Sequence, residues 1–327
     1  MPELYTYIFF VFLLFITELF YFKLAEHFNI IDHPNDRSSH TTLTLRGGGI
    51  IFPIAILLYS AYFGFQYPYF ICGLFLISFI SFWDDLHTIS NKIRLFLHLV
   101  SVSLLFVELG ILNYPVWIIC LSYILIIGTI NAYNFMDGIN GITGLYSLTA
   151  FITLYFLNNS LHFISNDLVI IIILALLVFL FFNFRTKAKC FAGDVGSVSI
   201  SFILLFAIGL LMIRTGQLLY ILFLAVYGVD TVLTILKRLL NKENIFEAHR
   251  SHAYQILSNE RKKPQLMVSF AYAFLQLLIN ALIIYILKFD SNIWGQLLFA
   301  FGLLFLLSFF YISIHILSSQ TNKKIHA

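Results

Sequence analysis

Long apolar stretches follow one another along the whole chain, and they constrain its fold more than any other feature of the sequence. A stretch of roughly 16–25 apolar residues is long enough, or nearly so, to cross about 30 Å of hydrocarbon as a helix. We therefore predict an all-α, polytopic integral membrane protein with about 11 transmembrane helices, in a single transmembrane domain over residues 1–327. The eleven stretches are roughly 5–22, 48–63, 67–83, 95–110, 114–130, 145–163, 168–184, 195–213, 218–236, 267–287 and 293–317.

The composition excludes most other classes of protein. Apolar residues (AVILMFWYC) make up 60% of the 327 residues, and charged residues make up 11%. Soluble domains usually contain about 45–50% apolar residues and about 25% charged residues. These values argue against a soluble enzyme, a disordered chain and a disulfide scaffold. A barrel would instead show alternating segments of about ten residues. The formal net charge of +3 implies no nucleic-acid surface, and we interpret Cys72, Cys120 and Cys190 as packing residues.

Basic residues lie almost entirely in alternate loops. Of the 19 Lys and Arg residues, all but Arg214 and Lys288 fall in one set of loops or in the tail after residue 317. Because cytoplasmic loops carry an excess of Lys and Arg, we predict an external N-terminus, a cytoplasmic C-terminus and an active site that faces the cytoplasm. This set of loops comprises residues 23–47, 84–94, 131–144, 185–194 and 237–266.

The first of these loops holds DHPNDRSSH (32–40) and then RGGG (46–49). Glycine N–H groups and Arg46 can together bind an anion. The alternative is a flexible turn.

Asp84 and Asp85 stand at the end of the third apolar stretch. Adjacent carboxylates near hydrocarbon repel each other and are stabilised by a cation. Because proteins usually hold Mg²⁺ through one or two carboxylates plus phosphate oxygens, the pair indicates a magnesium site beside a phosphate-bearing substrate. An acidic pair solvated at the membrane surface is the alternative.

The stretch NAYNFMDGINGITG (131–144) has no basic residue. If the fifth helix continues into it, Asn131, Asn134 and Asp137 follow at steps of three and fan across one side of the helix. They would then form the second side of a metal and sugar site, whereas the alternative is a loop with amide caps.

Asp194 lies between two glycines in FAGDVGS, just before an apolar stretch. Asp194 or Ser197 is expected to cap the N-terminus of the next helix. Together with the other acids, Asp194 is also a candidate metal ligand at a position that favours phosphate.

The loop at residues 237–266 contains HRSH (249–252). Imidazoles beside the Arg250 guanidinium offer several donors to a diphosphate, and a solvated surface loop is the alternative. Within the apolar stretches, Glu18 and Asp230 are ionisable exceptions of the kind that often mark function. For Asp230, a structural ion pair with Lys237 and Arg238 and a catalytic role are two equally open interpretations.

In this order, the motifs resemble those of the polyprenyl-phosphate N-acetylhexosamine-1-phosphate transferases. This membrane family includes initiators of bacterial O-antigen synthesis and the phospho-muramoyl-pentapeptide transferase of peptidoglycan synthesis. The resemblance rests on DHPNDRSSH with RGGG, WDDL, NAYNFMDGINGITG, FAGDVGS, Asp230-Thr231 and HRSH, and it runs from about Asp32 to Gln255.

The resemblance implies transfer of a HexNAc-1-phosphate from a UDP-N-acetylhexosamine to undecaprenyl phosphate, with release of UMP, in the bacterial inner membrane. It implies a cofactor, Mg²⁺ or Mn²⁺, and it leaves a homodimer open. It also implies roles for the residues singled out above. Asp84, Asp85 and Asp137 would be catalytic, Asp84, Asp85 and Asp194 would bind the metal, and Arg46, Asn131, Asn134, Arg250 and His252 would bind substrate.

Two positions depart from the family pattern. Asn140 stands where many members carry Asp, and HRSHAYQ is less rich in histidine than the loop of relatives that act on N-acetylglucosamine. The HAYQ variant resembles the O-antigen branch, for which 6-deoxy amino sugars are expected. A transporter or flippase of lipid-linked or anionic cargo is the alternative function, but transporters place their polar residues near the bilayer midplane.

Overall fold

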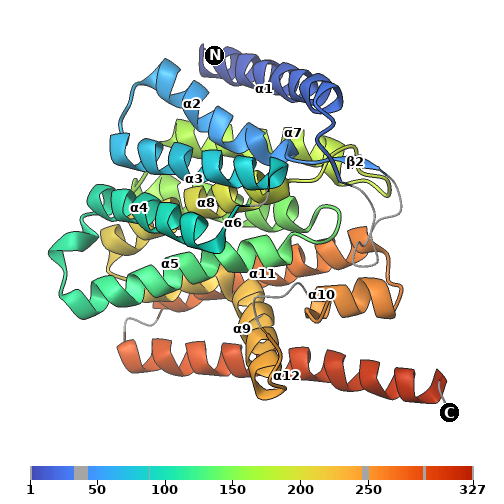
Figure 1. Cartoon of the computed structure of the whole chain (residues 1–327). Coiled ribbons are helices and arrows are strands. Elements are labelled where there is room, and N and C mark those ends of the chain that lie inside the picture. Colours follow the sequence, from blue (N-terminus) through green and yellow to red (C-terminus); the bar gives the residue numbers. More distant parts are fainter. Residues whose placement is uncertain (1, 33–42, 88, 245–249, 290–291, 326–327) are drawn as a thin grey trace.

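A computed structural model shows a protein built almost entirely of helices, and it describes residues 2–32, 43–87, 89–244, 250–289 and 292–325 (Figure 1). Four short helical turns join the longer helices: η1 (Gly48–Ile50), η2 (Ile111–Asn113), η3 (Leu218–Leu224) and η4 (Ile256–Glu260). The helices are α1 (Pro2–His27), α2 (Ile51–Phe63), α3 (Pro68–Leu86), α4 (Asn91–Leu109), α5 (Val116–Met136), α6 (Ile142–Leu161), α7 (Asn166–Asn183), α8 (Gly193–Thr215), α9 (Ala225–Leu240), α10 (Ala253–Gln255), α11 (Gln265–Phe289) and α12 (Ile293–Ile325).

Every apolar stretch of the sequence lies within this set of helices. Within the described ranges, eight helices are long and apolar enough to cross a membrane. The other three predicted stretches form α2, α4 and α6. An all-α polytopic membrane protein is thus confirmed, while the count of eleven spans and their orientation stay predictions.

Helix α8 lies at the centre of the molecule. It packs against α3, α5, α6, α2 and α4, and its residues from Val195 to Ile208 are all buried. A helix that is apolar all round must be covered on every side. Figure 1 shows most of the helices running roughly side by side, with α9 crossing their direction and α12 at the edge.

Asn158 does not interrupt the sixth apolar stretch, because α6 continues through it to Leu161. Its side chain is buried and accepts hydrogen bonds from the backbone N–H groups of Phe163 and Ile164. Its amide group also donates to the carbonyl of Ile164. A buried amide with these partners is satisfied, and it closes the turn into α7.

A short antiparallel ribbon follows α1. Strand β1 (Ile31–Asp32) pairs with β2 (Thr44–Leu45), and Leu45 forms a further bridge with Cys190 in the segment before α8. The ribbon thereby carries Asp32 and Arg46 to the N-terminal end of α8. Most of the DHPNDRSSH motif, and also His249, lie outside the described residues.

Candidate active site

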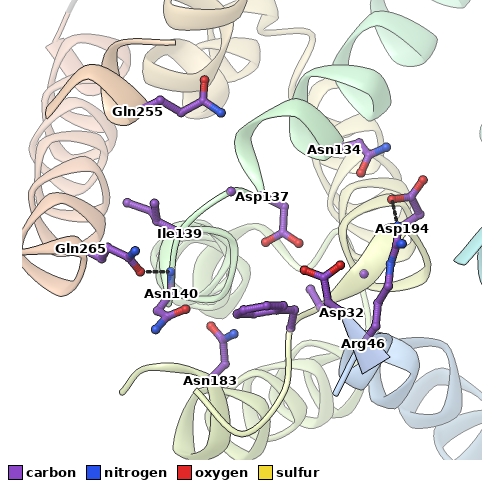
Figure 2. A pocket seen from close by; sticks show the side chains of 14 residues that line it. Asp32, Arg46, Asn134, Asp137, Ile139, Asn140, Asn183, Asp194, Gln255 and Gln265 are labelled. Atoms are coloured by element: carbon purple, nitrogen blue, oxygen red, sulfur yellow. Dashed lines mark hydrogen bonds and ion pairs between the residues drawn. The ribbon is translucent and has the colours of Figure 1, made fainter. Parts of the chain in front are cut away.

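A polar pocket of about 270 Å³ lies where four of the predicted cytoplasmic loops meet (Figure 2). It brings together residues more than 200 positions apart in the sequence, from Asp32 to Gln265. These loops therefore meet in three dimensions, while the side of the membrane on which they lie stays a prediction. The lining residues are Asp32, Arg46, Asn134, Asp137, Gly138, Ile139, Asn140, Asn183, Phe191, Ala192, Gly193, Asp194, Gln255 and Gln265.

Asp85 joins α3 to the start of α8. Its two carboxylate oxygens accept hydrogen bonds from the backbone N–H groups of Asp194 and Val195, each at 3.0 Å. The prediction that Asp194 or Ser197 caps this helix is therefore wrong, because a carboxylate from another helix takes the free N–H groups. Ser197 instead donates to the Asn134 carboxamide at 3.0 Å.

Arg46 links Asp85 to the pocket. Its Nε lies 2.7 Å from Asp85 and its Nη2 lies 3.5 Å from Asp194. The Asp85 side chain is fully buried, whereas that of Arg46 is 36% exposed. Burial alone would lower the pKa of Arg46, but the neighbouring carboxylates outweigh it and hold that pKa above its usual value. The guanidinium therefore stays charged at the pocket wall.

Two of the three glycines after Arg46 do not offer their N–H groups to an anion. The N–H groups of Gly48 and Gly49 donate to the carbonyls of Phe191 and Ala192 at 2.8 and 3.0 Å. A Cβ at Gly49 would collide with the backbone of Gly196. The interpretation that these N–H groups bind an anion is wrong, because they hold η1 against the start of α8.

Asp137 and Asn134 lie at the end of α5 and face the pocket (Figure 2). Helix α5 ends at Met136, as the following glycine predicts. Burial raises the pKa of Asp137 to about 7, and the nearby Asp194 carboxylate adds to the shift. Asn131 does not line the pocket, because its amide donates to the carbonyl of Ile127 within its own helix. The expected fan of three residues therefore reduces to two.

Asp84 does not line the pocket. Its carboxylate accepts a hydrogen bond from the Ile89 N–H at 2.8 Å and pairs with Arg94 at 3.0 Å. This contact fixes the turn between α3 and α4. Two adjacent acids at the end of one helix thus have different partners, and Asp85 is the one connected to the pocket.

His252 and Arg250 do not line this pocket. His252 is 1% exposed, and its Nδ1 lies 3.1 Å from Asp230. Asp230 also accepts hydrogen bonds from the Ala253 N–H and from the Tyr272 hydroxyl. The ion pair with Lys237 and Arg238, one of the two roles left open for Asp230, is therefore replaced by contacts to the HRSH loop and to Tyr272. The diphosphate roles of Arg250 and His252 stay predictions.

Carboxamide side chains line the opposite wall of the pocket, and the sequence analysis assigned no role to most of them. The Asn140 N–H donates to Gln265, and the Asn140 amide donates to the carbonyl of Arg185. Asn183 accepts from the N–H of Gly141. Only the NAYNFMDGINGITG motif pointed toward this wall. Nothing near Asn183 or Gln265 in the sequence signals a site, because the fold alone brings them here.

Asp32, Asp137 and Asp194 contribute three carboxylates to the pocket against one guanidinium. Hard oxygen ligands in excess of positive charge fit Mg²⁺ or Mn²⁺. Among the described residues, no three His, Cys, Asp or Glu side chains form a group that could hold an ion by themselves. An ion here would therefore take further oxygens from a substrate and from water.

The part of the chain that matches a known family contains several of these motifs. Residues 67–214 match the family described as Glycosyl transferase family 4, a range that holds both Asp85 and Asp194. The chain is 28% identical over 267 residues to a probable undecaprenyl-phosphate N-acetylglucosaminyl 1-phosphate transferase of Bacillus subtilis, covering 72% of this chain and 71% of the relative.

Two thermophile proteins are similarly related. A phospho-N-acetylmuramoyl-pentapeptide-transferase of Thermotoga neapolitana is 29% identical, over 66% of this chain and 77% of the relative. An undecaprenyl-phosphate alpha-N-acetylglucosaminyl 1-phosphate transferase of Thermotoga maritima is 27% identical, over 76% and 81%. Residues 67–214 therefore match a Glycosyl transferase family 4 domain, and the chain is similar to these transferases, in agreement with the resemblance of its motifs.

Proposed function

We propose that the protein transfers a HexNAc-1-phosphate from a UDP-sugar to undecaprenyl phosphate. The sugar-bearing phosphorus exchanges its bond to the UMP oxygen for a bond to an oxygen of the lipid phosphate, so that UMP leaves and a polyprenyl-diphosphate-sugar forms. The relatives support transfer of a sugar phosphate to a lipid carrier. The observation that carries the proposal is the Arg46 guanidinium, which lies between Asp85 and Asp194 at the wall of the polar pocket.

The residues of the pocket can position and neutralise a diphosphate. Phosphoryl transfer requires mainly alignment of the reacting groups and compensation of negative charge. Arg46 supplies a planar donor group for phosphate oxygens. Asp85 holds this guanidinium beside the start of α8, at the wall of the pocket. The carboxamides of Asn140 and Gln265 offer donors and acceptors to the sugar or the base.

Asp194 and Asp137 are the residues we propose for Mg²⁺ or Mn²⁺. A bound divalent ion would neutralise charge that develops on the phosphate oxygens. Asp194 already touches Arg46, and Asp137 lies in the same pocket. Asp84 and Asp85, the other ligands proposed from the sequence, would have to exchange their present contacts with Arg94, Arg46 and backbone N–H groups for the ion. Asp194 is therefore the main metal ligand in this proposal.

The sugar and the pathway rest on the sequence resemblance. We propose a role in starting a lipid-linked glycan such as O-antigen, at the cytoplasmic face of the inner membrane. The relatives named above act on N-acetylglucosaminyl and N-acetylmuramoyl-pentapeptide substrates, as their names state. The HAYQ sequence after Arg250 favours a 6-deoxy amino sugar for this chain.

A panel assay tests the proposal. Purified protein in detergent is given undecaprenyl phosphate, one UDP-HexNAc at a time and Mg²⁺, and UMP and the lipid product are quantified by mass spectrometry. We expect turnover with at least one donor, and we expect EDTA to remove it and Mg²⁺ to restore it. Absence of turnover across the panel with both Mg²⁺ and Mn²⁺ would contradict the proposal.

Asp84→Asn examines the catalytic role expected of that residue. We expect turnover to be lost while the protein keeps its melting temperature in detergent. Arg94→Gln is the matched variant, because it breaks the same ion pair from the other side. An equal loss in both variants would assign Asp84 to the turn between α3 and α4 instead of the reaction.

A further inference from the structure

The apolar stretch from Leu218 to Leu240 is long enough to span a membrane, but it does not form one continuous helix. Its first part is η3, a 3₁₀ helix, and its second part is α9, which begins at Ala225. Figure 1 shows that α9 crosses the direction of most other helices. A break in a spanning helix frees backbone N–H and C=O groups, and within hydrocarbon no water can satisfy them. The break between η3 and α9 therefore needs partners from neighbouring helices.

The side chain of Gln276 on α11 provides these partners. Gln276 is fully buried, and α11 packs against both η3 and α9. Its Nε2 donates a hydrogen bond to the carbonyl of Leu222 at 3.0 Å, and its Oε1 accepts one from the N–H of Val226 at 3.1 Å. Val226 is the second residue of α9, a position whose N–H has no acceptor within a helix. One carboxamide therefore joins the end of η3 to the start of α9.

Other side chains fix the orientation of this carboxamide. The Nε2 of Gln276 also donates to Asn280 at 2.7 Å, and its Oε1 also accepts from the hydroxyl of Tyr146 at 2.6 Å. Both donors and both acceptor positions of the carboxamide are therefore used. Tyr146 in turn stacks on Tyr227 of α9, with ring centroids 3.7 Å apart. A buried polar network in which every group is satisfied specifies a single arrangement of the helices.

One turn farther along both helices, α9 and α11 meet again beside the HRSH loop. Asp230 follows Val226 by one turn, and Tyr272 precedes Gln276 by one turn. The Tyr272 hydroxyl donates a hydrogen bond to Asp230 at 2.6 Å. The Asp230 carboxylate also contacts a backbone N–H and an imidazole of the loop segment 250–255, each at 3.1 Å. Helix α11 therefore fixes the direction of α9, and α9 holds this segment.

We propose that Gln276 is a positioning residue, which sets the direction of α9 and thereby places the segment 250–255 at the polar pocket. Gln276 does not line this pocket, whereas Gln255, at the end of the segment, does. The inference rests on the proposed function, because we place the nucleotide-sugar of that reaction in the polar pocket. Loss of the Gln276 carboxamide should therefore weaken binding of the nucleotide-sugar without any change in the residues that line the pocket.

Distances between spin labels measure the positions of α9 and of the segment directly. Labels are attached through Leu240→Cys at the end of α9 or Glu260→Cys beyond the segment, each paired with Phe156→Cys on α6. These three side chains are exposed, and the exposed Cys72 and Cys120 are first replaced by serine. Pulsed electron paramagnetic resonance on the full chain in detergent then gives a distance distribution for each pair.

Gln276→Met removes the carboxamide but keeps a side chain of nearly the same length. We expect both distance distributions to broaden, because the N–H of Val226 then lacks its acceptor. We expect the KM for the nucleotide-sugar to rise about tenfold and the KM for undecaprenyl phosphate to stay unchanged. A loss of folded protein alone would lower kcat and leave both KM values unchanged.

Asn280→Leu is the matched control. Asn280 is buried on the same helix, one turn after Gln276, and its amide donates to Thr153 of α6 instead of to α9. We expect a comparable fall in melting temperature, but distances and KM values as in the wild type. Tyr146→Phe is a milder variant, because it removes one hydrogen bond to Gln276 and keeps the ring on Tyr227. It should broaden the same distances and raise the same KM about two- to threefold.

The readouts separate this inference from the proposed function. Unchanged distances in both Gln276→Met and Tyr146→Phe, or a KM shift of equal size in Asn280→Leu, would overturn the positioning role and leave the transferase intact. Absence of turnover in the wild type with every UDP-sugar, together with broadened distances in Gln276→Met, would keep the role in placing α9 and reject the transferase.

Discussion

The two ends of α3 carry similar contacts, but they differ in what surrounds them. At its start, Glu108 of α4 accepts hydrogen bonds from the backbone N–H groups of Tyr69 and Phe70, at 2.8 and 3.1 Å. At its end, Asp85 does the same for the first N–H groups of α8. Each carboxylate therefore caps the N-terminus of a helix other than its own. Glu108 of α4 caps α3, and Asp85 of α3 caps α8.

The difference lies in the number of partners. Glu108 uses a single oxygen, Oε2, for both N–H groups. Asp85 uses both of its oxygens and in addition holds Arg46, which reaches the polar pocket. A capping carboxylate is therefore a structural feature by itself, and it becomes part of a candidate site when it also positions a charge toward a cavity.

The largest effect is expected from Asp85→Asn. The amide NH₂ group cannot accept a hydrogen bond, so one N–H at the start of α8 loses its partner and Arg46 loses its buried counter-charge. We expect activity to fall on the order of 10²-fold and stability to fall by about 1–3 kcal/mol. Activity assays and urea or thermal unfolding in detergent measure the two losses. Wild-type activity would show that this end of α3 is only a cap.

Gly49→Ala tests the close contact between η1 and α8 that places Arg46. The added Cβ would collide with Gly196, and neither backbone can move freely. We expect a loss of about 1–3 kcal/mol in stability with reduced activity. Gly128→Ala on α5 is the control, because a Cβ there meets nothing within 4 Å, and it should be neutral or slightly stabilising. Equal behaviour of the two variants would contradict the packing argument.

Asp137 should give the polar pocket a pH dependence. Its pKa of about 7 means that the carboxyl is neutral at lower pH and ionised above. If the ionised form binds the metal, activity rises with pH through about 7, and the residual activity of Asp137→Asn is flat there. Initial rates across this range test the prediction, and an unchanged profile in the variant would assign the dependence to another group.

The same pKa also predicts a change in stability. The unfolded carboxyl has a pKa of about 3.9, so the folded value is raised. The contribution of Asp137 to stability is then fully present below about pH 4 and is lost as the pH rises through about 7. Melting temperatures of the wild type and of Asp137→Asn across this range should converge at low pH.

The smallest effect is expected from Glu108→Gln. The amide oxygen can still accept both N–H groups, so only the favourable charge at the helix N-terminus is lost. We expect a cost of about 0.3–1 kcal/mol and unchanged kcat and KM. A loss of activity comparable with that of Asp85→Asn would mean that the two ends of α3 are coupled, and the contrast between them would then be wrong.

Sequence analysis predicted the helices well because each apolar stretch is a local property of the chain. Length and hydropathy alone place both ends of α8 within two residues, whereas α12 continues eight residues beyond its predicted end. Asn158 is polar within an apolar stretch, and the sequence around it does not show that backbone groups beyond Leu161 satisfy its side chain. Local pattern cannot show where a buried amide finds its partner.

The sequence identified candidate site residues, but it did not show which residues they contact. The motifs identified Arg46, Asp85 and Asp194 as important, but the sequence did not show that Asp85 caps a helix that begins more than 100 residues later. Likewise, the sequence left Asp230 open between a pair with nearby basic residues and a catalytic role, and the structure places it against His252 and Tyr272. Such pairs depend on which helices become neighbours.

The sequence by itself determined that this chain is a membrane protein, and it predicts that its basic residues lie on one side. Both follow from the free energy of burying each stretch in lipid, which depends on composition and length. Only the tertiary structure decided which acids meet: Asp85 is held at the start of α8, Asp84 is turned toward Arg94, and Asp137 faces the pocket. Adjacent residues on one helix point in different directions, so the packing of helices distant in sequence selects their partners.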